Sequence, residues 1–353
     1  MKIMVTGAAG FIGSAVCRQA LRSTTAQIVA LDKMTYAASP ETLQPLIESG
    51  RVVHERVDIC DAEQVGRAFR EHRPDLVMHL AAESHVDRSI DAPDVFIQTN
   101  VIGTFNLLNT ARRFWAELDG TAKSRFRFHH ISTDEVYGSL GDTGFFTEET
   151  SYAPSSPYAA SKASSDHLVS AWHHTFGLPA VISNCSNNYG PYQFPEKLIP
   201  LTIINALEGR DLAIYGTGQN VRDWLHVEDH ATALLTIATQ GRPGVSYNVG
   251  GNAERTNIEV VQAICDVLDR VKPRKDGRSY SVQRTFVQDR PGHDHRYAID
   301  ASKIRKDLNW EPAHSFEAGI EATVRWYLDN QTWWRNIRNE VYQGERIGVA
   351  KAA

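Results

Sequence analysis

The sequence predicts an α/β protein built on a doubly wound parallel sheet, with a smaller C-terminal α/β lobe. Three observations lead to this fold class. Short apolar segments typical of buried strands alternate with segments of helical periodicity along most of the chain. The first such strand runs directly into a glycine-rich turn, and the second ends in an acidic residue, Asp32. Together these features are typical of an open sheet that binds a dinucleotide.

The overall composition is that of an ordinary globular protein, with 353 residues, 42% hydrophobic and 22% charged. The net charge of -5 gives no reason to expect nucleic acid or a membrane as partner. The four cysteines are scattered, as expected for reduced thiols in a cytoplasmic protein, and no secretory signal precedes the first strand. No His-Glu-x-x-His or zinc-type spacing occurs, so we expect no metal.

The first expected strand covers residues 2–6, and a turn with glycines at 7, 10 and 13 leads into a helix that runs through Leu21. Glycines allow the backbone to turn tightly and to approach a pyrophosphate, while the helix N-terminus offers amide donors. The next strand, 27–31, ends in Asp32, whose carboxylate can accept hydrogen bonds from the adenosine ribose and would repel a 2′-phosphate. NAD is therefore favoured over NADP, although Lys33 could partly offset that repulsion.

Two more strands are expected at 52–57 and 76–80. Asp58 and Ile59 could meet the adenine, but Asp58 could equally cap the helix expected at 62–71. The small residues after position 80 would let a cofactor pass close. The full set of residues expected at the dinucleotide is Gly7, Gly10, Phe11, Ile12, Gly13, Asp32, Lys33, Thr35, Asp58, Ile59, Leu80, Ala81, Ala82, Ser84, Thr99, Tyr158, Lys162 and Asn188.

The most informative stretch runs from His130 to Lys162. A strand at 126–131 is followed by Thr133, Asp134 and Glu135, which therefore stand at the strand end where ligands bind in such sheets. Tyr158 and Lys162 are four residues apart on the next helix and share one face of it. A phenol beside an ammonium group suits proton transfer, whereas adjacent acids at a strand end are more often a solvated turn.

The remaining chain continues the alternation and then departs from it. An apolar stripe on the long helix at 93–118 indicates packing or a subunit interface. Residues 216–223 are expected to form a polar loop that carries Arg222. Strands are expected at 180–184, 212–215, 246–249 and 280–287, and helices at 158–176, 227–239, 257–271, 302–309 and 316–330, with a further helix beginning near Lys197.

These residues make the sequence resemble the extended short-chain dehydrogenase/reductase family, and in particular its sugar-nucleotide 4,6-dehydratases. The similarity runs nearly end to end, and Thr133-Asp134-Glu135 is its most discriminating part, because related epimerases usually have small or hydroxyl residues at the two acidic positions. The matching segments are the Gly7 turn, residues 80–89, 132–138, 158–162, 186–192 and 221–224, and Asp289-Arg-Pro-Gly-His293.

The resemblance implies a domain division and a tightly bound NAD+ that is regenerated in each turnover. An NAD-binding Rossmann domain would comprise 1–185 and 223–252, and a sugar-nucleotide-binding domain 186–222 and 253–353. The implied partner is the sugar nucleotide dTDP-glucose, and a homodimer is expected. The implied substrate contacts are Ser84, Thr133, Asn187, Lys197, Leu198, Arg222, Asn257, Arg290 and His293.

By the same resemblance, Tyr158 removes the C4 hydroxyl proton as hydride leaves C4, with Lys162 lowering the pKa of the phenol and Thr133 assisting. Glu135 then removes the C5 proton, and Asp134 as the protonated acid helps the C6 hydroxyl to leave as water. Two carboxyl groups in different environments can hold these opposite protonation states. The alternatives are another dehydratase, an epimerase or a decarboxylase of the same fold, or a non-catalytic NAD-sensing or scaffold protein.

Overall fold

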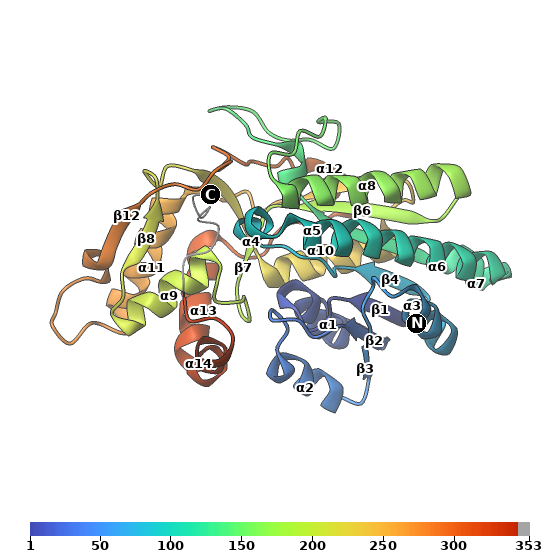
Figure 1. Ribbon diagram of the computed structural model, residues 1–353, viewed down its shortest axis with the longest axis horizontal. Coiled ribbons are helices and arrows are strands. Elements are labelled where there is room, and N and C mark those ends of the chain that lie inside the picture. Colours follow the sequence, from blue (N-terminus) through green and yellow to red (C-terminus); the bar gives the residue numbers. More distant parts are fainter. Residues whose placement is uncertain (345–353) are drawn as a thin grey trace.

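The computed structural model describes residues 1–344 and is organised around a seven-stranded sheet (Figure 1). The strands lie in the order β10-β6-β5-β4-β1-β2-β3, and every neighbouring pair is parallel. This order reverses between β1 and β4, as in doubly wound dinucleotide-binding folds. The strands are β1 (Lys2–Thr6), β2 (Gln27–Asp32), β3 (Val52–Arg56), β4 (Leu76–His79), β5 (Arg127–Thr133), β6 (Ala180–Cys185) and β10 (Ser246–Val249). The predicted fold class is confirmed.

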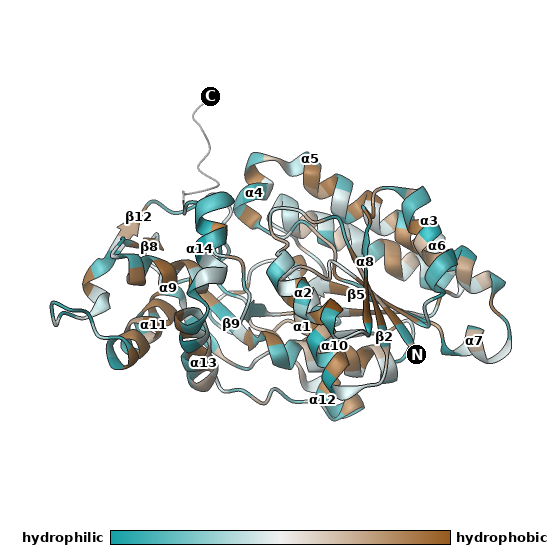
Figure 2. Ribbon diagram, turned by 90° about the horizontal axis from the view of Figure 1, so that it is seen from below, coloured by the Kyte–Doolittle hydropathy of each residue, from teal (hydrophilic) through white to brown (hydrophobic). Residues whose placement is uncertain are grey.

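Helices cover both faces of this sheet, since strands buried on both sides need an apolar layer above and below. One face packs against α1 (Phe11–Ser23), α2 (Pro40–Glu48) and α10 (Val227–Gln240). The other packs against α3 (Ala62–His72), α6 (Thr104–Glu117) and α8 (Pro157–Phe176). Figure 2 shows the apolar residues concentrated on the strands between these layers. The C-terminal ends of the strands remain free to form a site.

The long helix predicted at 93–118 is helical from Pro93 to Glu117 but is not uniform. It consists of α5 (Pro93–Phe96), a π-helix (Ile97–Gly103) and α6. The predicted apolar face is divided: Leu108 and Ala111 are fully buried, whereas Phe105 is 39% exposed. Ile97 and Ile102 are exposed too, so this helix carries apolar side chains that the chain itself leaves uncovered.

The smaller lobe has its own core and two small sheets. One sheet has the order β11-β9-β7, and the other pairs β12 with β8. Their strands are β7 (Asn187–Tyr189), β8 (Leu212–Tyr215), β9 (Val221–His226), β11 (Glu254–Thr256) and β12 (Arg284–Val287). Helices α9 (Leu198–Glu208), α11 (Asn257–Val271), α13 (Phe316–Asp329) and α14 (Gln331–Glu340) bury the apolar side chains of this lobe. Figure 1 places them beside the large sheet.

Several sequence predictions need correction here. The polar loop expected at 216–223 ends early, because β9 begins at Val221 and pairs with β7 and β11. The strand expected at 280–287 forms only over Arg284–Val287, after a 3-10 turn at Tyr280–Gln283. The helix expected at 302–309 is α12 (Ser302–Leu308). It packs on strand β10 of the large sheet and on helix α10, and Ile304 joins the core there.

The proposed domain division stays a prediction, and its last part, 345–353, lies outside the described residues.

The other helical segments are α4 (Val86–Asp91) and α7 (Gly120–Arg125), together with a 3-10 turn at Asp134–Tyr137. Within residues 1–344, no helix combines the length and the apolar character needed to cross a bilayer.

Candidate active site

A cavity of about 310 Å³ lies at the C-terminal ends of the large sheet, between that sheet and the smaller lobe. All five predicted catalytic residues line it, as does every predicted cofactor residue except Asp58. Of the predicted substrate residues, Ser84, Thr133, Asn187 and Lys197 line it, and Leu198, Arg222, Asn257, Arg290 and His293 do not. The sheet thus brings together residues that are up to 190 positions apart in sequence (Gly7 to Lys197).

The glycine turn between β1 and α1 is too tight for larger residues. Gly7 has a φ of +70°, and a Cβ there would come within 2.8 Å of the Ala81 amide nitrogen. At Gly13 a Cβ would lie 2.0 Å from the Gly7 carbonyl oxygen. The backbone amides and the N-terminus of α1 consequently face the cavity unobstructed, which is the arrangement that holds a pyrophosphate. The cavity therefore fits an NAD molecule at this end.

Asp32 ends β2 at the cavity wall, as predicted. Its carboxylate accepts hydrogen bonds from the backbone amides of Ala9 (3.0 Å) and Met34 (2.8 Å), so it is locked in place. Burial raises its pKa, and these two amide donors oppose that rise. The Lys33 ammonium lies 3.7 Å from the Asp58 carboxylate, so its charge is already paired. A carboxylate fixed at this point favours a free ribose hydroxyl over a phosphate.

We expect Asp32→Ala to lower NAD occupancy by about tenfold or more, because it removes a charge-assisted acceptor. The nucleotide that copurifies with the protein can be released by denaturation and quantified against protein by chromatography. Asp119→Ala is the control, because Asp119 is an exposed carboxylate at the start of α7 that makes no capping hydrogen bond and does not line the cavity. Unchanged cofactor content in Asp32→Ala would contradict the ribose role.

Tyr158 and Lys162 are placed by the start of α8. Ser156 caps this helix by accepting the Ala159 amide, and Pro157 occupies its first position, so Tyr158 stands in the first turn at the cavity. Lys162 is buried and donates to the Ile131 carbonyl at 2.8 Å, which ties it to the end of β5. Burial raises the pKa of the Tyr158 phenol well above its ordinary value, and Glu135 raises it further, while Thr133 lowers it. The lowering of this pKa by Lys162 stays a prediction.

Asp134 and Glu135 follow β5 in a 3-10 turn that Thr133 caps by accepting the Glu135 amide at 3.3 Å. Asp134 is 1% exposed, and burial together with the charges of Glu135 and Asp223 holds its pKa well above the usual range. Burial also raises the pKa of Glu135, but the cations Arg290, Arg222 and Lys197 oppose this rise. The protonated form is therefore favoured more strongly at Asp134 than at Glu135, which has three cations near it.

Arg222 and Arg290 are placed beside the acids rather than on the cavity wall. Arg222 is buried in β9, donates to the Asp294 carbonyl at 2.9 Å and lies over the Tyr297 ring at 4.2 Å. Arg290 pairs with Asp87 at 2.5 Å. Both guanidinium groups lower the pKa of Glu135. The positive charge that they place next to the cavity suits either a diphosphate or an ionised base.

The other three predicted substrate residues that do not line the cavity lie in the smaller lobe. Asn257 begins α11, Leu198 begins α9, and the His293 Nδ1 donates a hydrogen bond to the Asp289 carboxylate at 2.6 Å. Their contacts with a substrate stay predictions.

Sequence reasoning missed a group of residues that complete the cavity. Short strands and loops contribute most of them, and neither periodicity nor spacing marked them. They are Leu31, Ala37, Ala38, Val57, Glu83, Ile131, Ser132, Cys185, Ser186, Gln193, Phe194 and Glu196. Two stretches could have indicated that this part of the chain lines a site, Asn-Asn at 187–188 and Pro-Glu-Lys at 195–197. Both interrupt the alternation of strands and helices with polar residues.

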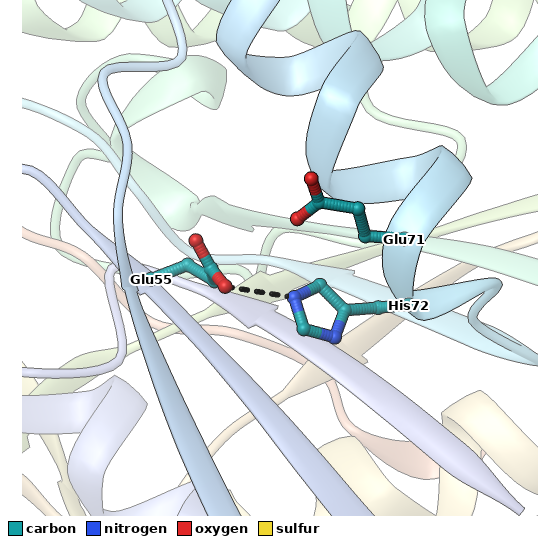
Figure 3. A group of neighbouring side chains, drawn as sticks. All are labelled: Glu55, Glu71 and His72. Atoms are coloured by element: carbon teal, nitrogen blue, oxygen red, sulfur yellow. Dashed lines mark hydrogen bonds and ion pairs between the residues drawn. The ribbon is translucent and has the colours of Figure 1, made fainter.

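Within the described residues, one group of potential metal ligands lies close together, namely Glu55, Glu71 and His72 (Figure 3). The His72 Nε2 lies 3.0 Å from Glu55, and Arg67 forms ion pairs with both glutamates. This group lies on β3 and α3, and none of its members lines the cavity. Because Arg67 and His72 already pair with these carboxylates, we interpret the group as a cluster of ion pairs.

The fold and this site define an NAD-binding enzyme of the short-chain dehydrogenase/reductase class. The chain belongs to the GDP-mannose 4,6 dehydratase family, whose match covers residues 4–323. It is 58% identical to the dTDP-glucose 4,6-dehydratase of Neisseria meningitidis serogroup B, over 99% of each chain. It is 57% identical to dTDP-glucose 4,6-dehydratase 1 of Escherichia coli K12, over 97% of each.

Among solved structures, it resembles the dTDP-glucose 4,6-dehydratase of Streptomyces venezuelae, which was solved with NAD and the ligand TYD bound. The TM-score is 0.87 at 42% identity, covering 96% of this chain and 100% of that one.

Proposed function

We propose that this protein is an NAD-dependent hydro-lyase that converts dTDP-glucose to dTDP-4-keto-6-deoxyglucose and water. The observation that carries the proposal is the pair Asp134 and Glu135, which lines the same cavity as Tyr158 and in which the pKa of Asp134 is raised more strongly than that of Glu135. A sugar 4-epimerase needs the tyrosine but neither acid. The choice of thymine as the base is supported by the names of relatives that are 58% and 57% identical.

Bound NAD+ supplies one function, the reversible acceptance of a hydride. The side chains supply the rest. Tyr158, held one turn from Lys162, removes the C4 hydroxyl proton as hydride leaves C4, and Thr133 hydrogen-bonds the C4 oxygen. The 4-ketone makes the C5 proton acidic, and Glu135 removes it. Protonated Asp134 gives its proton to the C6 hydroxyl, which leaves as water. The hydride then returns to C6, and a proton returns to C5.

Placement of the substrate follows from the cations around the acids. Lys197, Arg222 and Arg290 all lower the pKa of Glu135, so they converge on the region next to the reacting carbons. Arginine in particular binds the paired oxygens of a diphosphate with two parallel hydrogen bonds. Ser84 and Asn187 line the same cavity and offer hydrogen bonds to sugar hydroxyls. We assign Leu198, Asn257 and His293 to the lining of the sugar-nucleotide site, as the family resemblance implies.

A labelled substrate gives the decisive test. The purified protein, without added cofactor, is incubated with dTDP-glucose that carries deuterium at C4, and the product is analysed by mass spectrometry. We expect the loss of one water with the deuterium found at C6, because the hydride is carried within the protein. Retention of deuterium at C4, or a changed C4 configuration without water loss, would contradict the dehydratase and favour an epimerase or a different nucleotide.

A homodimer is the proposed assembly, supported by the uncovered apolar side chains of the α5–α6 segment. Ile97 is 48% exposed, Ile102 40%, and Phe176 on neighbouring α8 44%. Phe105 packs edge-on against Trp172 of α8, so the two helices present one apolar surface. A cytoplasmic location is also proposed, supported by four cysteines that are all free thiols.

A further inference from the structure

The loop that follows Asp32 makes contacts that the activity alone does not explain. Between β2 and α2 the chain leaves the large sheet and reaches the smaller lobe, where Tyr36 and Ala37 pack against the lobe's apolar core. The Tyr36 ring meets Phe194 edge-on at 5.4 Å. The neighbours of Tyr36, namely Thr35, Ala37 and Ala38, line the cavity. This loop therefore forms a wall of the cofactor cavity and a contact between the two lobes at once.

The contact is held by one buried carboxylate, Glu196. Its Oε1 accepts a hydrogen bond from the Tyr36 hydroxyl at 3.2 Å, and its Oε2 accepts one from Arg88 Nε at 2.9 Å. The Glu196 side chain is 3% exposed and that of Arg88 32%. The Arg88 guanidinium also lies over the Tyr36 ring, 4.0 Å from its centroid. Three chain segments are joined in this way, and each charged or aromatic group has two partners.

These contacts lie at the edge of the cofactor cavity. Glu196 itself lines the cavity, and so do Phe194 and Lys197 on either side of it. Lys197 adds a further tie by donating to the Ser84 carbonyl at 3.0 Å. The same cavity is lined by Gly7, Gly10 and Asp32, the residues expected at the dinucleotide. The loop after Asp32 therefore borders the expected cofactor site while it is fastened to the smaller lobe.

We propose that Tyr36, Arg88 and Glu196 form a clasp that fastens the loop after β2 to the smaller lobe and thereby slows the dissociation of NAD. The inference rests on the proposed function in one respect: a hydride that is removed and returned within one turnover requires the reduced cofactor to stay bound between the two steps. A clasp between lobes provides this retention without additional contacts to the reacting atoms. Cofactor release then requires the clasp to open.

The test measures cofactor exchange in the holoenzyme. Protein that carries its copurified NAD is mixed with an excess of isotopically labelled NAD+, and the bound fraction is sampled over time by rapid desalting and mass spectrometry. Glu196→Gln removes the negative charge and keeps the shape of the side chain. We expect it to exchange NAD about tenfold faster than the parent, because the loss of one charge-assisted hydrogen bond has an effect of this size. Tyr36→Phe, which removes one hydroxyl, should accelerate exchange by a smaller factor.

The matched control is Glu208→Gln. Glu208 pairs with Arg338 at 2.8 Å with side-chain exposures of 26% and 4%, so this ion pair matches that of the clasp in length, has the arginine instead of the carboxylate as its buried partner, and lies within the smaller lobe. Its exchange rate should equal that of the parent. Equal exchange rates in the parent, Glu196→Gln and Tyr36→Phe would overturn the clasp, and so would equal acceleration in Glu208→Gln. Because the assay contains no sugar nucleotide, its outcome is independent of the labelled-substrate test.

Discussion

Replacing Tyr158 with phenylalanine should reduce turnover by about 10²–10⁴-fold, the usual contribution of a positioned acid–base group. Tyr158 is 8% exposed, and the phenol oxygen is the only polar atom of its side chain, so the variant keeps the packing and loses the proton acceptor. No reduced nicotinamide should form when dTDP-glucose is added, because C4 oxidation itself is blocked. Single-turnover absorbance of the bound cofactor measures this step directly.

The Tyr158→Phe variant should still retain NAD although it loses turnover. The reason is that the glycine turn and Asp32 are expected to hold the cofactor without the phenol. Bound NAD in Tyr158→Phe is therefore measured in the same preparation. Reduced nicotinamide that appears at the parent's rate would show that another group accepts the C4 proton.

Glu135→Gln should stop the reaction one step later. The oxidation at C4 needs Tyr158 and Lys162 and should persist, so reduced nicotinamide should accumulate on the enzyme while water loss falls by about 10²–10⁴-fold. Glutamine keeps the size of the side chain and can still approach the cations Arg222 and Arg290, but it cannot take a proton from C5. The product is analysed by mass spectrometry and the cofactor by absorbance in the same sample.

The two variants thus separate the half-reactions. A second readout is the exchange of the C5 proton with deuterated solvent, which the parent should catalyse through Glu135 and the variant should not. Normal 6-deoxy product from purified Glu135→Gln would show that the base has been assigned wrongly, whatever happens at C4.

The sequence by itself determined the large sheet and most of the cofactor wall. A parallel strand buried on both faces appears as a short apolar run, and the glycines of the first turn are required by backbone geometry, so both can be recognised locally. Gly7, Asp32, Tyr158 and Lys162 could be placed on this basis, because each occupies a fixed position relative to a strand end or a helix turn. The pairing of Asp134 with Glu135 was likewise visible, since the two are adjacent.

Only the tertiary structure decided how the smaller lobe meets that sheet. Strand β9 begins with Val221, Arg222 and Asp223, so it lacks the apolar run that marks the other strands, which is why Arg222 was expected in a loop. The environments of the two acids also depend on distant residues: Asp223 and Arg290 shift their pKa values from other parts of the chain. Tyr36, Arg88 and Glu196 are separated by up to 160 positions in sequence, and their joint contact exists because folding buries one carboxylate between them.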